Sequence, residues 1–284
     1  MATRNKNPRA GVVGLLRYGK HTTKAALRVI RQRRVTGPQI AADVAALGVR
    51  PGGILLVHSS LSALGYVPGA ARTVIDALRQ AVGPDGTLVM PTHSWSQMAK
   101  GCRTFDVRRT SSCVGQITEQ FRQMPSVIRS RHPTHSVAAC GPLAEDLAAN
   151  HDRSDTPCGH GTPYERIMEL DGQVLLLGVG TIANTCFHAT EAIAGVAYLL
   201  QEASDTFDII DESGCSRTIS VRRHQPHVRR RFPEMEEILV REGIAKRGMV
   251  GNSESLLAQG RVMRDFLLRK LREDPTFLLA RNGP

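Results

Sequence analysis

The stretch ILLVHSSLSALGYVPGAARTVIDALRQAVGPDGTLVMP, residues 54–91, decides the fold. It opens with a short apolar run, continues through an amphipathic pattern over 69–82 that the turn GPDG (83–86) stops, and closes with a second apolar run at 87–91. Short apolar runs bounded by turn residues are typical of buried strands. A strand, a helix and a strand in about 35 residues make a βαβ unit, which predicts a parallel sheet.

The alternation of helical and extended patterns continues beyond this unit. Helices are predicted over 37–48, 114–124, 142–150, 163–170, 234–242 and 254–274, and strands over 136–140, 173–179, 207–211 and 215–221. No internal repeat or low-complexity linker divides the 284 residues, which suffice for one full core. We therefore expect an α/β fold with a single domain over 35–284. Its central, mostly parallel sheet is flanked by helices, and a basic helical segment over 1–34 precedes it.

The positive charge of the chain is concentrated at its N-terminus. Residues 1–34 hold ten Lys or Arg and no Asp or Glu, whereas the rest of the chain holds 27 basic and 26 acidic residues. An amphipathic basic helix here favours an anionic membrane surface or nucleic acid as its partner. The segment also resembles a mitochondrial transit peptide in its arginine content. A solvated tail with one packed helix is the third alternative.

The six cysteines are scattered along the chain and form no C-x-x-C pair. Since no signal-peptide pattern precedes them, reduced thiols in a cytoplasmic protein are expected rather than a disulfide framework or a zinc knuckle. No apolar run approaches the roughly 18 residues that a membrane span needs.

Residues 178–183, GVGTIA, match the G-x-G-x-x-A fingerprint of dinucleotide-binding turns. The string follows a predicted strand and precedes a helical pattern, and Asp211 ends the next strand-like run. Glycines at such a turn let backbone N–H groups approach a pyrophosphate. A dinucleotide-dependent oxidoreductase is therefore one candidate function, although any tight strand-to-helix turn favours the same small residues.

Two pairs of residues have the three-residue spacing that places metal ligands on one helical face. His132 and His135 flank Pro133, where a regular helix is disfavoured, and His188 with Glu191 does not match H-E-x-x-H. Ligands from separate segments could still form a tetrahedral site, so a metal site stays open at this point without support from the spacing.

The pair His188–Glu191 in NTCFHATE (184–191) is suited to acid–base chemistry. An imidazole with an ordinary pKa of about 6.5 can take a proton from an amine or a hydroxyl at neutral pH. A glutamate three positions later lies on the same helical face and can orient the ring. The alternative is an ordinary surface pair. Cys186 lies nearby, but a lone cysteine is more often a small buried hydrophobe than a nucleophile.

A series of segments resembles the aminoglycoside 3-N-acetyltransferase family, which is distinct from the GNAT acetyltransferases. The similar segments cover roughly residues 37 to 200 in the family's order: LLVHSSLSALGYVPGAARTVIDAL (55–78), GPDGTLVMPTHS (83–94), FDVRRTSSCVGQITEQFR (105–122), RSRHPTHSVAACGP (129–142), TPYERIMELDGQVLLLGVG (162–180) and NTCFHATE (184–191). The resemblance implies transfer of an acetyl group from acetyl-CoA to an amine of an aminoglycoside or another aminosugar.

The resemblance also implies roles for individual residues. His188 would be the general base for direct attack by the amine, with Glu191 positioning the base or the amine. Acyl-CoA would contact the HSSLS loop and the PTHS turn, through His58, Ser59, Ser60, Leu61, Ser62, Thr92 and Ser94. Residues expected near the acceptor or the thioester are His132, Ser136, Asn184, Thr185 and Asp106. Neither an acyl-enzyme nor a metal is needed.

The acceptor's charge bears on its identity. Polycationic aminoglycosides call for an acidic pocket, and candidate acids near the similar segments are Asp106, Asp152, Asp155, Glu191, Glu202, Asp205 and Asp208. The stretch HQPHVRRRF (224–232) is strongly basic and disfavours a polycation. An aminosugar of glycan or natural-product biosynthesis therefore stays open beside a role in drug resistance. A non-catalytic protein that binds an anionic surface through 1–34 is the last alternative.

Overall fold

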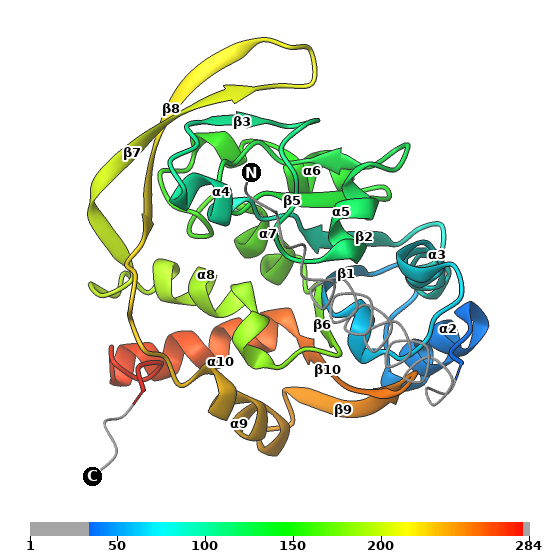
Figure 1. Cartoon of the computed structure of the whole chain (residues 1–284). Coiled ribbons are helices and arrows are strands. Elements are labelled where there is room, and N and C mark those ends of the chain that lie inside the picture. Colours follow the sequence, from blue (N-terminus) through cyan, green and yellow to red (C-terminus); the bar gives the residue numbers. More distant parts are fainter. Residues whose placement is uncertain (1–33, 281–284) are drawn as a thin grey trace, which may run out of the picture. The chain divides into compact units, whose positions relative to one another are not determined.

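Within the described residues 34–280 of the computed structural model, a seven-stranded sheet of order β4-β5-β2-β1-β6-β10-β9 forms the centre of the fold (Figure 1). Its strands are β1 (Ile54–Ser59), β2 (Thr87–Pro91), β4 (Ile128–Arg129), β5 (Val137–Cys140), β6 (Gln173–Leu177), β9 (Ala245–Val250) and β10 (Ser253–Gln259). Strand β1 pairs in parallel with both β2 and β6, and the outer pairings are antiparallel. The α/β fold and the βαβ unit predicted from residues 54–91 are confirmed.

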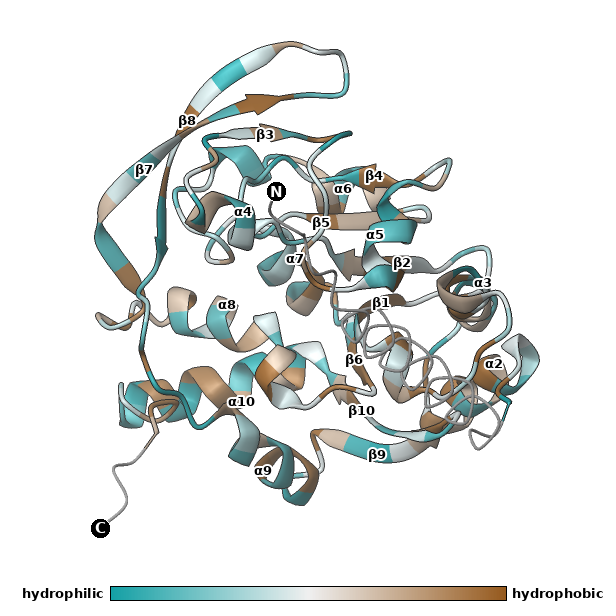
Figure 2. Cartoon of the chain, in the orientation of Figure 1, coloured by the Kyte–Doolittle hydropathy of each residue, from teal (hydrophilic) through white to brown (hydrophobic). Residues whose placement is uncertain are grey.

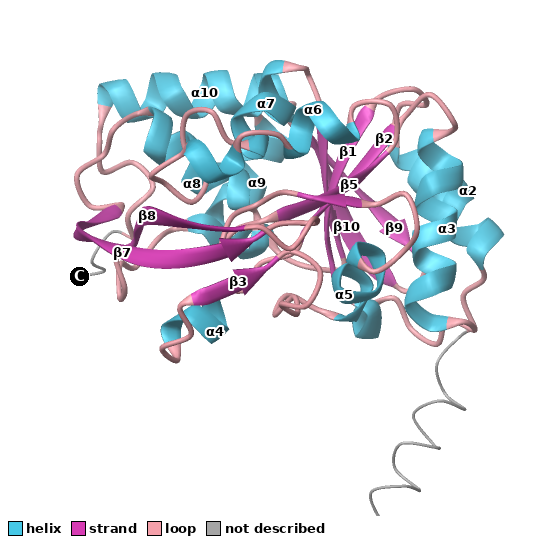
Figure 3. Cartoon of the chain, turned by 90° about the horizontal axis from the view of Figure 1, so that it is seen from above, coloured by secondary structure: helices cyan, strands magenta, loops and turns pink. Residues whose placement is uncertain are grey.

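Helices cover both faces of this sheet (Figure 3). One face carries α2 (Gly37–Leu47), α3 (Ala70–Val82) and α5 (Gln116–Arg122). The other carries α6 (Ala144–Ala148), α7 (Pro163–Glu169), α8 (Thr185–Ile193), α9 (Met235–Arg241) and α10 (Gly260–Glu273). Residues 35–280 belong to one compact unit. The basic helix predicted over 1–34 lies outside the described residues, apart from Arg34.

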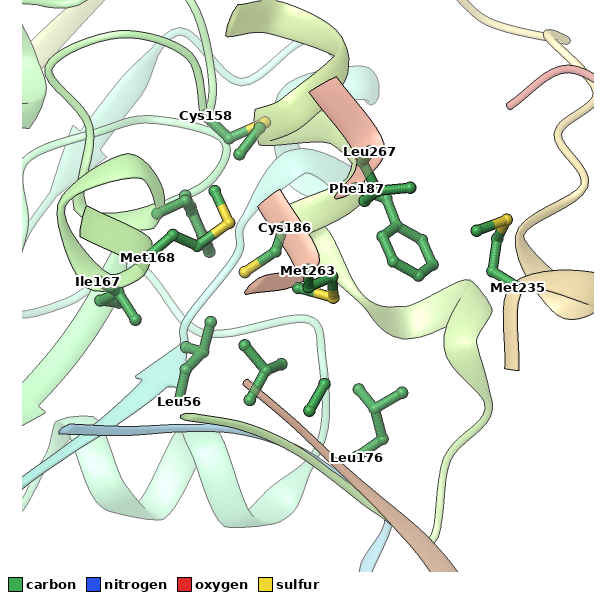
Figure 4. Packing of buried hydrophobic residues seen from close by; sticks show 14 of the residues in the cluster. Leu56, Cys158, Ile167, Met168, Leu176, Cys186, Phe187, Met235, Met263 and Leu267 are labelled. Carbon is green, nitrogen blue, oxygen red and sulfur yellow. The ribbon is translucent and has the colours of Figure 1, made fainter. Parts of the chain in front are cut away.

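The central strands β1, β2 and β6 bury side chains on both faces, and so their sequences are largely apolar. Leu55 and Val57 of β1 join the core beneath α2 and α3, whereas Leu56 joins the core beneath α7, α8 and α10. Figure 4 shows Leu56 in this second core together with Phe187 of α8 and Met263 of α10. In Figure 2 the central strand β6 has the same hydrophobic character. Each fully buried aliphatic side chain contributes roughly 1.5–3 kcal/mol, so the ends of β1 and β6 are held firmly.

A second sheet of three strands has the order β3-β7-β8. Its strands are β3 (Thr104–Asp106), β7 (Leu200–Ile210) and β8 (Ser216–His224). The hairpin of β7 and β8 was predicted, but β7 begins seven residues before the predicted start at Phe207. The sequence pattern missed these residues because the first half of β7 is largely exposed and so lacks an apolar face. The hairpin matters for the site because its register pairs Leu200 with His224 and returns the chain toward α8.

The prediction of a single helix over 254–274 is wrong in its first third. Residues Ser253–Gln259 form β10, which pairs antiparallel with β6 and β9, and α10 begins only at Gly260. The pattern SESLLAQ carries four consecutive buried residues between two strands, and such a run is compatible with either helix or strand. Pairing with the edge of β6 decided the outcome. In the part of the chain that is described, no helix is long and apolar enough to cross a membrane.

Candidate active site

A cavity of about 650 Å³ opens where the parallel strands end; we call it the strand-end cavity. Its walls include His58 and Ser59 at the end of β1, His93 just after β2, and Val179 just after β6. Parallel strands end at one edge of a sheet, which is the usual position of ligand sites in open α/β folds. Further parts of the wall come from the start of α8, the end of β8, the helix α4 (Trp95–Ala99), and the loop before β5 that holds Thr134 and His135.

Helix α8 presents its first turns to the strand-end cavity. The side chain of Asn184 accepts a hydrogen bond from the backbone N–H of Cys186 and so caps the helix. Asn184, Thr185 and His188 all line the cavity, whereas Cys186 is fully buried in the core, where burial raises the pKa of its thiol to about 12. A neutral, enclosed thiol is not an activated nucleophile.

His188 and Glu191 form a hydrogen-bonded pair at this wall. Nδ1 of His188 lies 2.7 Å from Oε2 of Glu191. The His188 side chain is 22% exposed, whereas the Glu191 carboxylate is completely buried. The guanidinium of Arg230 closes the other side, with Nε 3.0 Å from Oε1 and 3.1 Å from Oε2 of Glu191. Arg230 is therefore the cationic partner of the buried carboxylate, and the imidazole of His188 is its second hydrogen-bonding partner.

Four imidazoles follow one another along the cavity wall. Ring centroids are 4.5 Å apart between His188 and His224, 4.9 Å between His224 and His135, and 4.5 Å between His135 and His93. His93 then reaches Tyr164, with 2.7 Å between Nε2 and the hydroxyl. Burial, and secondarily the neighbouring imidazoles, hold the pKa values of His93 and His135 well below the usual range. Burial and the nearby His188 and Arg230 do the same for the pKa of His224. These three rings are neutral hydrogen-bonding groups at neutral pH.

The end of β1 carries two polar atoms without partners within residues 34–280. Nε2 of His58 and Oγ of Ser59 are both buried and unpaired, and both residues line the strand-end cavity. Burial lowers the pKa of His58 to about 3, so its ring is neutral. Unpaired buried polar atoms are costly, so a bound molecule that pairs with them gains affinity.

The structure brings together some of the residues predicted for the site and separates others. His58, Ser59, Asn184, Thr185 and His188 line the strand-end cavity, and Glu191 lies behind His188. The other predicted residues do not line it: Ser60, Leu61, Ser62, Thr92, Ser94, His132, Ser136 and Asp106.

The buried residues outside the lining have structural partners. Thr92 and Ser136 bond each other and the buried Arg129 guanidinium, and Ser94 donates to the carbonyl of Pro133. His132 is fully buried, and its ring centroid lies 4.5 Å from that of His151. Its Nδ1 accepts from the backbone N–H of His135, whereas its Nε2 has no partner within residues 34–280.

The aspartate and serine positions that do not reach the cavity fix turns of the chain. Asp106 caps a turn by accepting from the backbone N–H groups of Arg108 and Arg109. Ser60 and Ser62 contact each other in the turn containing the 3-10 helix η1 (Leu61–Ala63), at 3.2 Å between hydroxyl oxygens.

Several residues of the site were not predicted. His224 lines the cavity and Arg230 contacts Glu191 outside the lining; both belong to a stretch whose only sequence signal was its basic charge. Gln201, Arg223 and Trp95 line the cavity and match no motif. Arg230 lies 39 positions from Glu191. A periodicity signal spans neighbouring turns, so it cannot report a contact over that separation.

The turn at 178–183 does not have the topology of a dinucleotide site. Gly178, at φ +67°, packs so closely that an added Cβ would lie 2.8 Å from Cβ of Ala63 and 2.9 Å from Oγ of Ser253. Gly180 has an ordinary φ of −79° and open space around it. Asp211 follows β7, which belongs to the second sheet and not to a strand beside β6. The glycine at 178 is thus explained by packing, and the oxidoreductase hypothesis is not favoured.

Among residues 34–280, no group of three or more His, Cys, Asp or Glu side chains is arranged to hold a metal ion. The histidine cluster instead pairs with Tyr164 and with other polar groups of the protein.

Comparison with known proteins identifies the family of this chain. The family described as aminoglycoside 3-N-acetyltransferase matches residues 56–272. The chain belongs to the aminoglycoside 3-N-acetyltransferase family. The resemblance seen in the sequence is confirmed, and with it the assignment to the acyltransferases.

Among curated members of the aminoglycoside 3-N-acetyltransferase family, aminoglycoside N(3)-acetyltransferase IV of a Salmonella species is 36% identical over 235 residues, covering 82% of this chain and 86% of that protein. Enzyme VII of Streptomyces paromomycinus is 32% identical over 262 residues, covering 82% and 90%. The crystal structure of a histidine-to-alanine variant of AAC(3)-IVa in complex with a gentamicin is 32% identical, with a TM-score of 0.76 over 88% of this chain and 93% of that one.

Proposed function

We propose that the protein transfers the acetyl group of acetyl-CoA to an amine of an aminoglycoside or another aminosugar, by direct attack with His188 as the general base. The observation that carries the proposal is the 2.7 Å contact between His188 and the buried carboxylate of Glu191 at the wall of the strand-end cavity. A relative of the same fold holds an aminoglycoside.

The contact sets the tautomer of the imidazole. A carboxylate can only accept hydrogen bonds, so Nδ1 of His188 is the donor to Glu191. The lone pair of the neutral ring then resides on Nε2, which is the nitrogen available to take a proton. The buried carboxylate stabilises the imidazolium once it forms, as in other carboxylate–histidine pairs. Arg230 offsets the charge of Glu191 and fixes its orientation.

The reaction balances without an acyl-enzyme. The neutral amine attacks the thioester carbon, and the N–C bond forms as the proton on nitrogen passes to Nε2 of His188. Collapse of the tetrahedral intermediate breaks the C–S bond, and CoA leaves as the thiolate. Hydrogen-bond donors near the carbonyl oxygen stabilise this intermediate by about 3 kcal/mol for each well-placed donor.

The thioester is proposed to lie at the end of β1. His58 and Ser59 offer unpaired polar atoms there, and Asn184 and Thr185 line the same cavity from the start of α8. These four residues keep their predicted role in binding acyl-CoA or the reacting groups. Ser60, Leu61, Ser62, Thr92 and Ser94 act instead through the turns that hold this wall.

The test is thiol release from acetyl-CoA in the presence of aminosugar and aminoglycoside acceptors. We expect wild-type protein to release CoA only when an acceptor is present. His188→Ala should lower the rate at least about a hundredfold, the low end for loss of a general base. His160→Ala is the matched control, because the His160 side chain is 71% exposed and lies outside the cavity. Near-normal turnover in His188→Ala would remove His188 from the mechanism.

A further inference from the structure

The lining of the strand-end cavity carries no carboxylate among the described residues. Apart from the histidines, the single ionisable side chain of the lining within residues 34–280 is Arg223, which is basic. A carboxylate does lie close by in Glu191, but it is fully buried behind His188 and paired with Arg230. From the part of the chain that the structure describes, the cavity therefore offers an incoming ammonium group no exposed negative partner.

Carboxylates on the segments around the cavity are neutralised by arginines. Asp205 on β7 pairs with Arg223 and with Arg103. Asp155 pairs with Arg222 of β8 at 2.8 Å. Each of these acids already has a cation beside it, and pairing with a substrate ammonium group would break an existing ion pair.

Two further acids lie near the cavity but do not line it. Glu202 follows the cavity residue Gln201 on β7 and is not part of the lining. Asp106 accepts hydrogen bonds from the backbone N–H groups of its own turn.

The residues outside the described range carry no acidic side chain. Residues 1–33 and 281–284 contain no Asp or Glu. Whatever positions these residues take, they add only neutral and basic side chains.

Apart from Arg223 and the histidines, the polar side chains that line the cavity are uncharged. They are hydroxyls and amides, as in Ser59, Thr134, Thr185, Asn184 and Gln201. Such groups both donate and accept, and this matches sugar hydroxyls. Trp95 and Ile182 add exposed apolar surface at the same wall, being 47% and 71% exposed.

We infer that the preferred acceptor is a hydroxyl-rich sugar with a single amine, the reacting one, rather than a polycationic aminoglycoside. This inference rests on the proposed acetyl transfer and names its substrate class. Each further ammonium group of a polycation would enter a cavity without a counter-charge and lose water without gaining an ion pair. A single amine avoids this cost, because it must be neutral to react.

The experiment compares specificity constants for two groups of acceptors on the full-length protein. One group contains glucosamine and its isomers with the single amine on another ring carbon; the other contains gentamicin and apramycin. We expect kcat/KM to be at least about tenfold higher for the best mono-amino sugar than for either polycation. A higher kcat/KM for gentamicin or apramycin overturns the inference.

A second measurement separates this inference from the proposed function. Acceptor binding to the protein with CoA, measured by calorimetry at low and at high salt, reads the charge preference without chemistry. We expect mono-amino sugars to bind with little salt dependence; tighter binding of the polycations with a steep loss in salt overturns the inference. If no amine gives thiol release, the proposed function fails, and the binding comparison alone decides the acceptor class.

A variant that supplies the missing charge provides the positive test. Gln201→Glu should raise the ratio of kcat/KM for apramycin to that for the mono-amino sugar by about fivefold. Gln201→Met is the matched control, because it keeps the size of the side chain without the charge. Equal ratios in the two variants would show that charge at this wall does not select the acceptor, which overturns the inference.

Discussion

The guanidinium of Arg230 lies 3.0 Å from Oε1 and 3.1 Å from Oε2 of Glu191, so one buried carboxylate is held by a residue 39 positions further along the chain. Glu191 has no solvent exposure, and the Arg230 side chain is only 11% exposed. The carboxylate that orients the proposed base is therefore itself positioned by the segment that follows β8.

Removal of Arg230 should destabilise the fold. Arg230→Met leaves the Glu191 carboxylate buried without its cation, and breaking such a pair typically costs about 3–5 kcal/mol. We expect a loss at the lower end of that range in the free energy of unfolding, measured by urea titration. Adding Glu191→Gln to this variant should recover part of the loss, because no buried charge is then left unpaired. Strictly additive losses would mean that the two residues do not interact.

Glu191→Gln alone should impair catalysis more than substrate binding. The amide can donate to Nδ1 of His188 and so favour the tautomer that carries its proton on Nε2, which cannot act as a base. We expect kcat to fall about a hundredfold or more, with KM for acetyl-CoA changing less than about threefold. Steady-state kinetics on a variant of unchanged melting temperature checks this. A large rise in KM with normal kcat would contradict it.

The buried histidines should make the fold sensitive to acid. Burial lowers the pKa of His58 to about 3 and that of His151 to about 4, from an ordinary 6.5. Below pH 6.5 the unfolded chain binds protons at these rings and the folded chain does not. The free energy of unfolding is therefore unaffected by these rings above pH 6.5. As the pH falls from 6.5 toward 4, it decreases by about 1.4 kcal/mol per pH unit for each ring.

Urea unfolding at a series of pH values measures this slope. His151→Gln should make the decline between about pH 6.5 and 4.5 shallower, whatever it does to the stability at neutral pH, because one buried imidazole is gone. His227→Gln is the control, since His227 is exposed. An unchanged slope in His151→Gln would show that His151 is protonated in the folded protein.

The two glycines of the G-x-G-x-x-A string should respond differently to alanine. At Gly178 a Cβ would lie 2.8 Å from Cβ of Ala63, and its φ of +67° disfavours a side chain. We expect Gly178→Ala to lower the melting temperature by several degrees, on the order of 1–3 kcal/mol. Gly180→Ala should leave both stability and acetyl transfer near wild type, because nothing lies within 4 Å of the added Cβ. Loss of activity in a stable Gly180→Ala would point to a ligand at this turn.

Ser59 and Ser62 provide a matched pair for the acyl-CoA site. Ser59 lines the strand-end cavity with an unpaired hydroxyl, whereas Ser62 is exposed outside it and contacts Ser60. Ser59→Ala should raise KM for acetyl-CoA or lower kcat by about tenfold. Ser62→Ala should change both by less than about twofold. The reverse order would move the thioester away from the end of β1.

Local sequence patterns determined the central βαβ unit, the hairpin of β7 and β8, and the pair His188–Glu191, because strand and helix periods and i,i+3 spacing act over a few residues. Residues 184–191 alone placed the imidazole and carboxylate on one helical face. The series of family-like segments added the acyl-transfer chemistry.

Tertiary structure decided the rest. Whether residues 253–259 were helix or strand depended on pairing with β6, and only packing showed that His132 and Ser136 are buried away from the cavity. The ion pair of Arg230 with Glu191 and the absence of carboxylates from the described lining arise from segments far apart in the sequence. Whether a charge in a cavity is compensated depends on all the residues that surround it in space. A local sequence pattern does not specify which residues those are.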